Sequence, residues 1–125
     1  MKLFLSLPLL VTGVIHLIPV IGVFGTEKLQ TLYGIDRVSD DLELLLRHRA
    51  VLFGIIGCLL LYSIFEPKLQ LIAVLVGLAS MLSFIGLAQM SDGVGAELKN
   101  VVRIDWICSV LLFAAIFGQQ FFPSD

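Results

Sequence analysis

The chain has 125 residues, of which 58% are hydrophobic and 14% are charged, and its formal net charge is -2. Soluble domains carry about 25% charged residues, so this composition excludes an ordinary soluble globular protein. The charge balance offers no basic face, so we expect no nucleic-acid partner. The length suits a single domain, residues 1–125.

Four apolar runs approach or exceed the roughly 20 helical residues that cross a bilayer. None of them shows the alternation of a strand, and only helices or closed barrels span lipid. The predicted transmembrane helices cover residues 3–24, 40–65, 69–90 and 98–122. Their short connections favour antiparallel neighbours, so the sequence predicts an all-α integral membrane protein, a four-helix up-down bundle.

The first run, residues 3–24, is too long for a signal peptide and lacks an A-x-A-like cleavage site. We therefore expect it to remain as the first helix. It carries His16 one turn before Pro19, and proline leaves the Ile15 carbonyl without a helical partner. His16 either stabilises that kink or belongs to a polar site.

The first loop predicts a short interfacial helix over about residues 27–33. Thr26 suits its N-cap, and Gly34 suits its C-terminal stop. Leu29 and Tyr33 share its apolar face, which favours a tyrosine at headgroup level.

The second helix is predicted to begin at Asp40, which forms a capping-box pattern with Glu43. That start brings Arg47, His48 and Arg49 into the span. Helical angle places Arg47 on the bundle face and Arg49 on the lipid face, from which its long side chain snorkels to the headgroups. His48 lies between the two.

The later helices bring further polar groups. The third helix carries small residues at close-packing intervals, which predicts helix contacts; these are Ala73, Gly77, Ser80 and Ser83. The fourth helix carries Asn100, Arg103 and Asp105, with Asp105 on its less bulky side.

By depth, these intramembrane polar groups gather in the half of the bundle next to the first loop, which we call the distal half. A charged Arg or Asp at the bilayer centre costs at least about 2.5–3.5 kcal/mol. We therefore predict that Arg47 pairs with Asp105 or Glu43, with His16 or His48 completing the network. The cluster either fixes helix register or binds a ligand, and both readings stay open.

The distal cluster holds more hydrogen-bond donors than its carboxylates can accept, which predicts a cavity open to water or a ligand. We expect it to be bounded by the first, second and fourth helices and roofed by residues 26–38. The candidate ligand-binding residues are Arg47, His48, Asp105, Arg103 and His16. The expected ligand is small and is anionic, quinone-like or a lipid headgroup. In the alternative, the protein is an accessory subunit of a larger membrane complex, or a homo-oligomer, and the cluster is purely structural.

No cofactor can be assigned from a motif. A haem is one possibility, because His16 and His48 each lie about 12 Å from their helix ends at similar depth. The chain has no P-loop, H-E-x-x-H or G-x-S-x-G motif, so we expect no metal site and identify no catalytic residue. Whether the protein is an enzyme stays open.

Nearly the whole chain resembles a family of small bacterial four-helix membrane proteins, broadly DoxX-like, through the stretches IHLIPVIGVFGTEKLQTLYGI, LLLRHRAVLFGIIG, GLASMLSFIGLA and VVRIDW. The resemblance implies a four-helix bundle in the bacterial inner membrane. Some DoxX-like members are linked to quinone-coupled sulfur oxidation, but no catalytic residue carries over. Some relatives are labelled phosphopantetheine adenylyltransferase, which we reject because that soluble α/β enzyme carries an H-x-G-H motif and this chain has neither.

The orientation of the bundle rests on few charges. Most Lys and Arg residues lie at the distal side, which by the positive-inside rule favours a cytoplasmic distal side. Arg47 is embedded, however, and Lys2 precedes a long apolar run. We therefore expect both termini in the cytoplasm.

Overall fold

The computed structural model describes residues 3–121, and within that range it contains helices and no strand. Phe122, the predicted end of the fourth helix, lies outside the described residues, as does Lys2. The elements are α1 (Leu3–Leu17), the 3-10 helix η1 (Ile18–Phe24), α2 (Thr26–Tyr33), α3 (Asp40–Ser63), the 3-10 helix η2 (Pro67–Leu69), α4 (Gln70–Gln89) and α5 (Ala96–Phe121).

Four helical stretches are long and apolar enough to cross a membrane, and they match the four predicted spans closely. They cover Phe4–Phe24, Asp40–Ser63, Pro67–Gln89 and Ala96–Phe121. The chain is therefore an all-α, multi-pass membrane protein.

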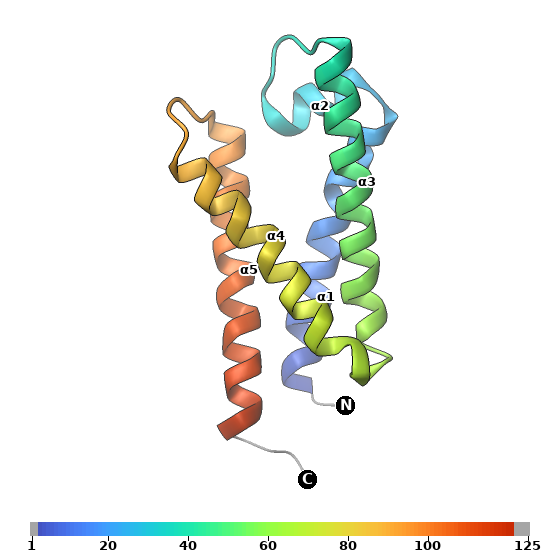
Figure 1. Cartoon of the computed structure of the whole chain (residues 1–125), viewed down its shortest axis with the longest axis vertical. Helices are drawn as coiled ribbons and strands as arrows, with labels where there is room; N and C mark the ends of the chain where they lie inside the picture. The colour runs from blue at the N-terminus through green and yellow to red at the C-terminus, as the bar shows by residue number, and fades with distance from the viewer. Residues whose placement is uncertain (1–2, 122–125) are drawn as a thin grey trace.

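The four long helices pack unevenly (Figure 1). α1 lies beside α3, and α5 packs against both α1 and α4. α4 starts near the end of α3 and crosses obliquely toward α5, so α3 and α4 diverge along their length. The start of α1 and the end of α5 lie at one end of the molecule, and α2 lies at the other, distal end.

The first span changes its helical form at Pro19. α1 ends at Leu17, and Ile18–Phe24 continues as a 3-10 helix of seven residues. Proline removes the N–H that the Ile15 carbonyl would bind, so the regular ladder cannot pass this point. Gly25, with φ 133°, then turns the chain into α2.

The first loop contains the predicted short helix. Gly34 ends it in the left-handed conformation, φ 64°, and its N–H donates to the Gln30 carbonyl at 2.8 Å, as predicted. The predicted N-cap is wrong, because Gly25 occupies that position. Thr26 is the first helical residue, and its hydroxyl donates to the Glu43 carboxylate on α3.

Helix α3 begins at Asp40, as predicted, but its cap is Ser39 rather than Asp40. The Ser39 hydroxyl accepts a hydrogen bond from the Leu42 N–H at 3.2 Å. Asp40, Asp41 and Glu43 then fill the first turn, where negative charge complements the helix dipole.

Two glycines set the close approach of α1 and α3. A Cβ added to Gly57 would lie 2.9 Å from the Leu17 Cδ2 and 3.0 Å from the Gly13 carbonyl oxygen. Small residues at such a crossing let two backbones approach closely, which is how helices associate in lipid.

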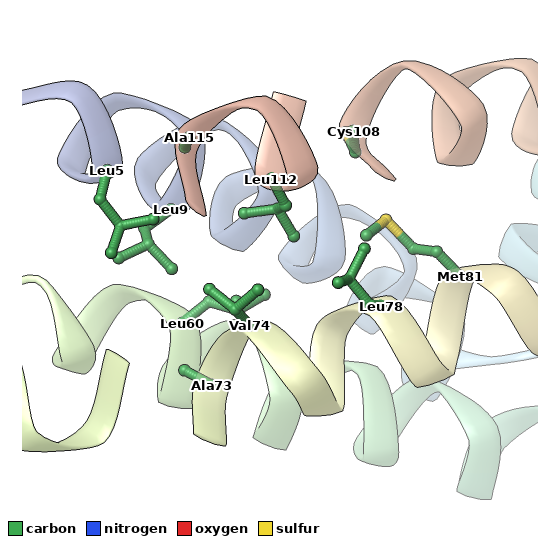
Figure 2. Packing of buried hydrophobic residues seen from close by; sticks show 10 residues of the cluster. All are labelled: Leu5, Leu9, Leu60, Ala73, Val74, Leu78, Met81, Cys108, Leu112 and Ala115. Atoms are coloured by element: carbon green, nitrogen blue, oxygen red, sulfur yellow. The ribbon is translucent and has the colours of Figure 1, made fainter. Parts of the chain in front are cut away.

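The closely packed core lies toward the end of the molecule that holds the start of α1 (Figure 2). All four long helices contribute to it, through Leu5, Leu9, Leu60, Ala73, Val74, Leu78, Met81, Cys108, Leu112 and Ala115. Of the predicted small-residue contacts on α4, Ala73 and Gly77 are buried, and Ser83 is exposed.

Candidate functional site

The distal half encloses a cavity of about 290 Å³, which we call the inner cavity. Its polar lining residues are His16, Tyr33, Arg49, Glu97, Asn100 and Asp105. Its apolar lining residues are Ile15, Ile18, Pro19, Leu32, Phe53, Val101 and Ile104. The predicted boundary by the first, second and fourth long helices is confirmed, and Leu32 and Tyr33 of α2 contribute the predicted roof.

His16 is buried, with 2% of its surface exposed, and it presents one free nitrogen. Its Nδ1 lies 2.9 Å from the Thr12 carbonyl, which can only accept, so Nδ1 carries a hydrogen. Its Nε2 is buried and has no hydrogen-bond partner in the described part of the chain. In the neutral ring, Nε2 is therefore an acceptor available to a ligand in the inner cavity. This bond goes to Thr12 rather than to the Ile15 carbonyl freed by Pro19.

Tyr33 points into the molecule, and its predicted depth at the headgroup level stays a prediction. Its side chain is 5% exposed, and its hydroxyl has no hydrogen-bond partner among residues 3–121. Burial raises the pKa of the Tyr33 phenol, an effect that the nearby positive charge of Arg49 opposes. The hydroxyl therefore keeps its proton at neutral pH and is available as a donor.

Two carboxyl groups from α5 face the same cavity. Asp105 is 8% exposed, and Glu97, in the first turn of α5, is exposed. A Cβ on Gly34 would meet the Glu97 carboxylate, so this side chain lies against the end of α2 and helps to close the roof.

Arg49 is the cation of the inner cavity, and it also lines the outer surface between α3 and α4, so the predicted lipid face is only part of its environment. Its guanidinium carbon lies 4.7 Å from the ring centroid of Phe84, 5.0 Å from that of Phe53 and 5.7 Å from that of Tyr33. Cations over aromatic faces are stabilised electrostatically. Three elements, α2, α3 and α4, therefore hold this arginine between them, and its charge acts on Asp105.

Arg47 contacts one of its two predicted partners, Glu43, and lies outside the inner cavity. Its Nε donates to the Val23 carbonyl at 2.9 Å, and its Nη1 lies 3.5 Å from Oε1 of Glu43. Pairing with Glu43 is confirmed, and it is the only salt bridge among residues 3–121. A direct pair with Asp105 is wrong, because the guanidinium is directed at the end of η1 instead.

His48 and Arg103 are exposed, and neither lines the inner cavity. Of the five candidate residues, the structure brings together His16 and Asp105 and leaves Arg47, His48 and Arg103 outside. His16 and His48 face no common cavity, so their predicted pairing around a haem gains no support. Among residues 3–121, no group of three His, Cys, Asp or Glu side chains is placed to hold a metal.

Sequence reasoning missed Arg49, Tyr33 and Glu97 as cavity residues. It placed Arg49 and Phe53 on one helical face correctly but assigned that face to lipid because its neighbours are bulky. An arginine four residues before a phenylalanine, together with a tyrosine on the apolar face of the loop helix, was the available signal.

The inner cavity combines an apolar wall with an acceptor, His16, a donor, Tyr33, one basic side chain, Arg49, and two acidic side chains, Asp105 and Glu97. Two acidic side chains beside one guanidinium disfavour an anion. A neutral polar head that both donates and accepts hydrogen bonds suits this arrangement. Its volume lies at the lower end of the range of small-molecule sites, about 300–1,000 Å³.

No family model, no curated protein and no solved structure matches the chain.

Proposed function

We propose that the protein binds the polar head of a small quinone-like amphiphile in the inner cavity, within one half of the bilayer. The observation that carries this proposal is the pair of buried, unpartnered polar atoms, Nε2 of His16 and the hydroxyl of Tyr33, on side chains that line one cavity. Each unmet buried group costs about 1–3 kcal/mol, so a bound head that meets both is favoured.

The acidic and basic side chains favour one of the three ligand classes that the sequence left open. Two acidic side chains, Asp105 and Glu97, disfavour a free anion or a phosphate-bearing lipid headgroup, and Arg49 is the one basic side chain that lines the cavity with them. A quinone ring carries carbonyl oxygens that accept from Tyr33 or Arg49, and its reduced form carries hydroxyls that donate to His16. The aromatic ring of Phe53, 5.5 Å from the His16 ring centroid, offers a stacking surface.

The proposed setting is the bacterial inner membrane, with the four spans arranged as an up-down bundle related to the DoxX-like proteins. The four apolar stretches support a membrane location. We place both termini in the cytoplasm on the strength of Lys2, although the loop cations Lys28, Arg37 and Lys99 lie at the opposite side. A reporter fused to the C-terminus and active only in the periplasm would reverse this orientation.

Two variants test the binding proposal. In lipid nanodiscs, calorimetry with an alkyl-substituted hydroquinone, whose hydroxyls can donate to Nε2 of His16, should show binding to the wild type. His16→Leu should weaken it about tenfold, the equivalent of about 1.4 kcal/mol for one lost hydrogen bond. His48→Leu is the matched control, because His48 is exposed and lies outside the cavity, and it should bind like the wild type.

Absence of hydroquinone binding by the wild type would overturn the proposal, as would equal affinities of the two histidine variants. Mass spectrometry of the purified protein adds a second readout. A co-purified quinone supports the proposal. No ligand, together with a stable larger complex, would favour the accessory-subunit alternative.

A further inference from the structure

A second hollow lies beside the inner cavity, on the outer surface between α3 and α4. Its volume is about 430 Å³, and we call it the lateral groove. Most of its lining is apolar, including Leu52, Ile56, Val76, Ala79 and Leu87. It lies where α3 and α4 diverge (Figure 1), within two membrane-spanning stretches, so it opens toward lipid.

The lateral groove and the inner cavity meet at two residues. Arg49 and Phe53 line both of them. The Arg49 guanidinium also contacts a ring on each side: it lies over Tyr33, which lines the inner cavity, and over Phe84, which lines the lateral groove. Two other lipid-facing hollows, lined by Ala114 and by Cys58, share no lining residue with the inner cavity.

The two spaces differ in chemistry. Besides Arg49, the polar side chains that line the lateral groove are two serines, Ser80 and Ser83, and the Ser83 hydroxyl already donates to the Ser80 carbonyl at 3.0 Å. The inner cavity offers Nε2 of His16 and the Tyr33 hydroxyl. Arg49, at the boundary, makes no salt bridge or hydrogen bond among the described residues, so its N–H groups remain available to an acceptor on the ligand.

We propose that the inner cavity and the lateral groove form one site for a two-part ligand, with the polar head inside and an isoprenoid tail in the groove. This inference rests on the proposed function and adds the part of the ligand that the inner cavity cannot hold. The ligand enters sideways from the bilayer between α3 and α4, and Arg49 binds it where head and tail join.

The test compares one benzoquinone head without a tail and the same head with two isoprene units. Ala79→Phe fills the lateral groove, and Ala114→Phe, on α5, fills the separate lipid-facing hollow. Both alanines are exposed, so the two substitutions are matched. Dissociation constants are calculated from the concentration of ligand in the nanodisc bilayer. This corrects for the tailed ligand, which partitions into lipid more strongly than the tail-less head.

Ala79→Phe should weaken the tailed ligand about tenfold and leave the tail-less head unchanged, because only the tail meets the new ring. Ala114→Phe should change neither affinity. Unchanged binding of the tailed ligand by Ala79→Phe would overturn the two-part site, as would an equal loss for both ligands. If neither ligand binds the wild type, the proposed function itself fails, which is a separable result. Equal thermal unfolding temperatures of the two variants show that both are folded.

Discussion

Toward the chain ends, Leu9, Leu60 and Leu112 are completely buried where the long helices meet, as Figure 2 shows. In the distal half, the first, second and fourth of these helices separate around the inner cavity, where His16 and Tyr33 keep polar atoms unpaired. Lipid is as apolar as a leucine core, so burial of apolar groups drives helix association weakly in a membrane. Close packing in one half therefore supplies stability, and the other half is left free to bind.

The largest effect should follow from disturbing the crossing of α1 and α3. Gly57→Val places a branched side chain against the Gly13 carbonyl and Leu17, which are already within 3.0 Å of a Cβ. We expect loss of the folded protein or a fall in its unfolding temperature of more than about 10 °C, as overpacking costs about 1–3 kcal/mol or more. Thermal unfolding in detergent measures it.

Gly86→Val is the control for this substitution, because a Cβ at Gly86 has nothing within 4 Å. Similar unfolding temperatures for the two valine variants would show that the glycine crossing does not hold α1 against α3.

A smaller effect should follow from opening a hole in the core. Leu60→Ala should lower the free energy of unfolding by about 2–3 kcal/mol, the lower part of the range for buried leucines, because the unfolded chain still contacts lipid. Leu71→Ala, at a side chain that is 64% exposed, should cost much less. Unfolding in mixed micelles compares them, and equal costs would contradict the assigned core.

The smallest effect on stability should come from the inner cavity. Asp105→Asn keeps the shape of a side chain that makes no ion pair or hydrogen bond within residues 3–121, so stability should change by less than about 1 kcal/mol. Binding should change instead, because removal of this carboxylate lets Arg49 attract an anion. Calorimetry with a short-chain carboxylate should show binding to this variant and none to the wild type. A stability loss as large as that of Leu60→Ala would mean that Asp105 is structural.

Much of the fold follows from patterns that lie close together in the sequence. Span lengths, the Gly34 stop and the start of α3 at Asp40 depend on local chemistry, and all three were predictable. A cavity bounded by the first, second and fourth long helices was predicted, but most of the donors that motivated it, Arg47, His48 and Arg103, lie outside it.

The assignment of particular side chains failed for a physical reason. Arg47 and Arg49 are two residues apart, so helical angle separates them by about 200° but says nothing about which face meets which neighbour. The carbonyl that Arg47 binds belongs to Val23, one residue before the end of η1, and the rings around Arg49 come from α2, α3 and α4. The surroundings of Arg47 and Arg49 both depend on which distant segments pack against α3. The spacing of residues along α3 alone does not contain that information.

The 3-10 form of η1 alters how far the first span reaches through the bilayer. Such a helix rises about 2.0 Å per residue, against 1.5 Å for an α-helix, so Leu3–Phe24 extends about 36 Å rather than about 33 Å. The 24 residues of α3 also extend about 36 Å. Pro19 interrupts the α-helical hydrogen bonds and so lengthens the first span, which has fewer residues than α3. The first span and α3 can therefore cross the same hydrophobic thickness without one of them tilting relative to the other.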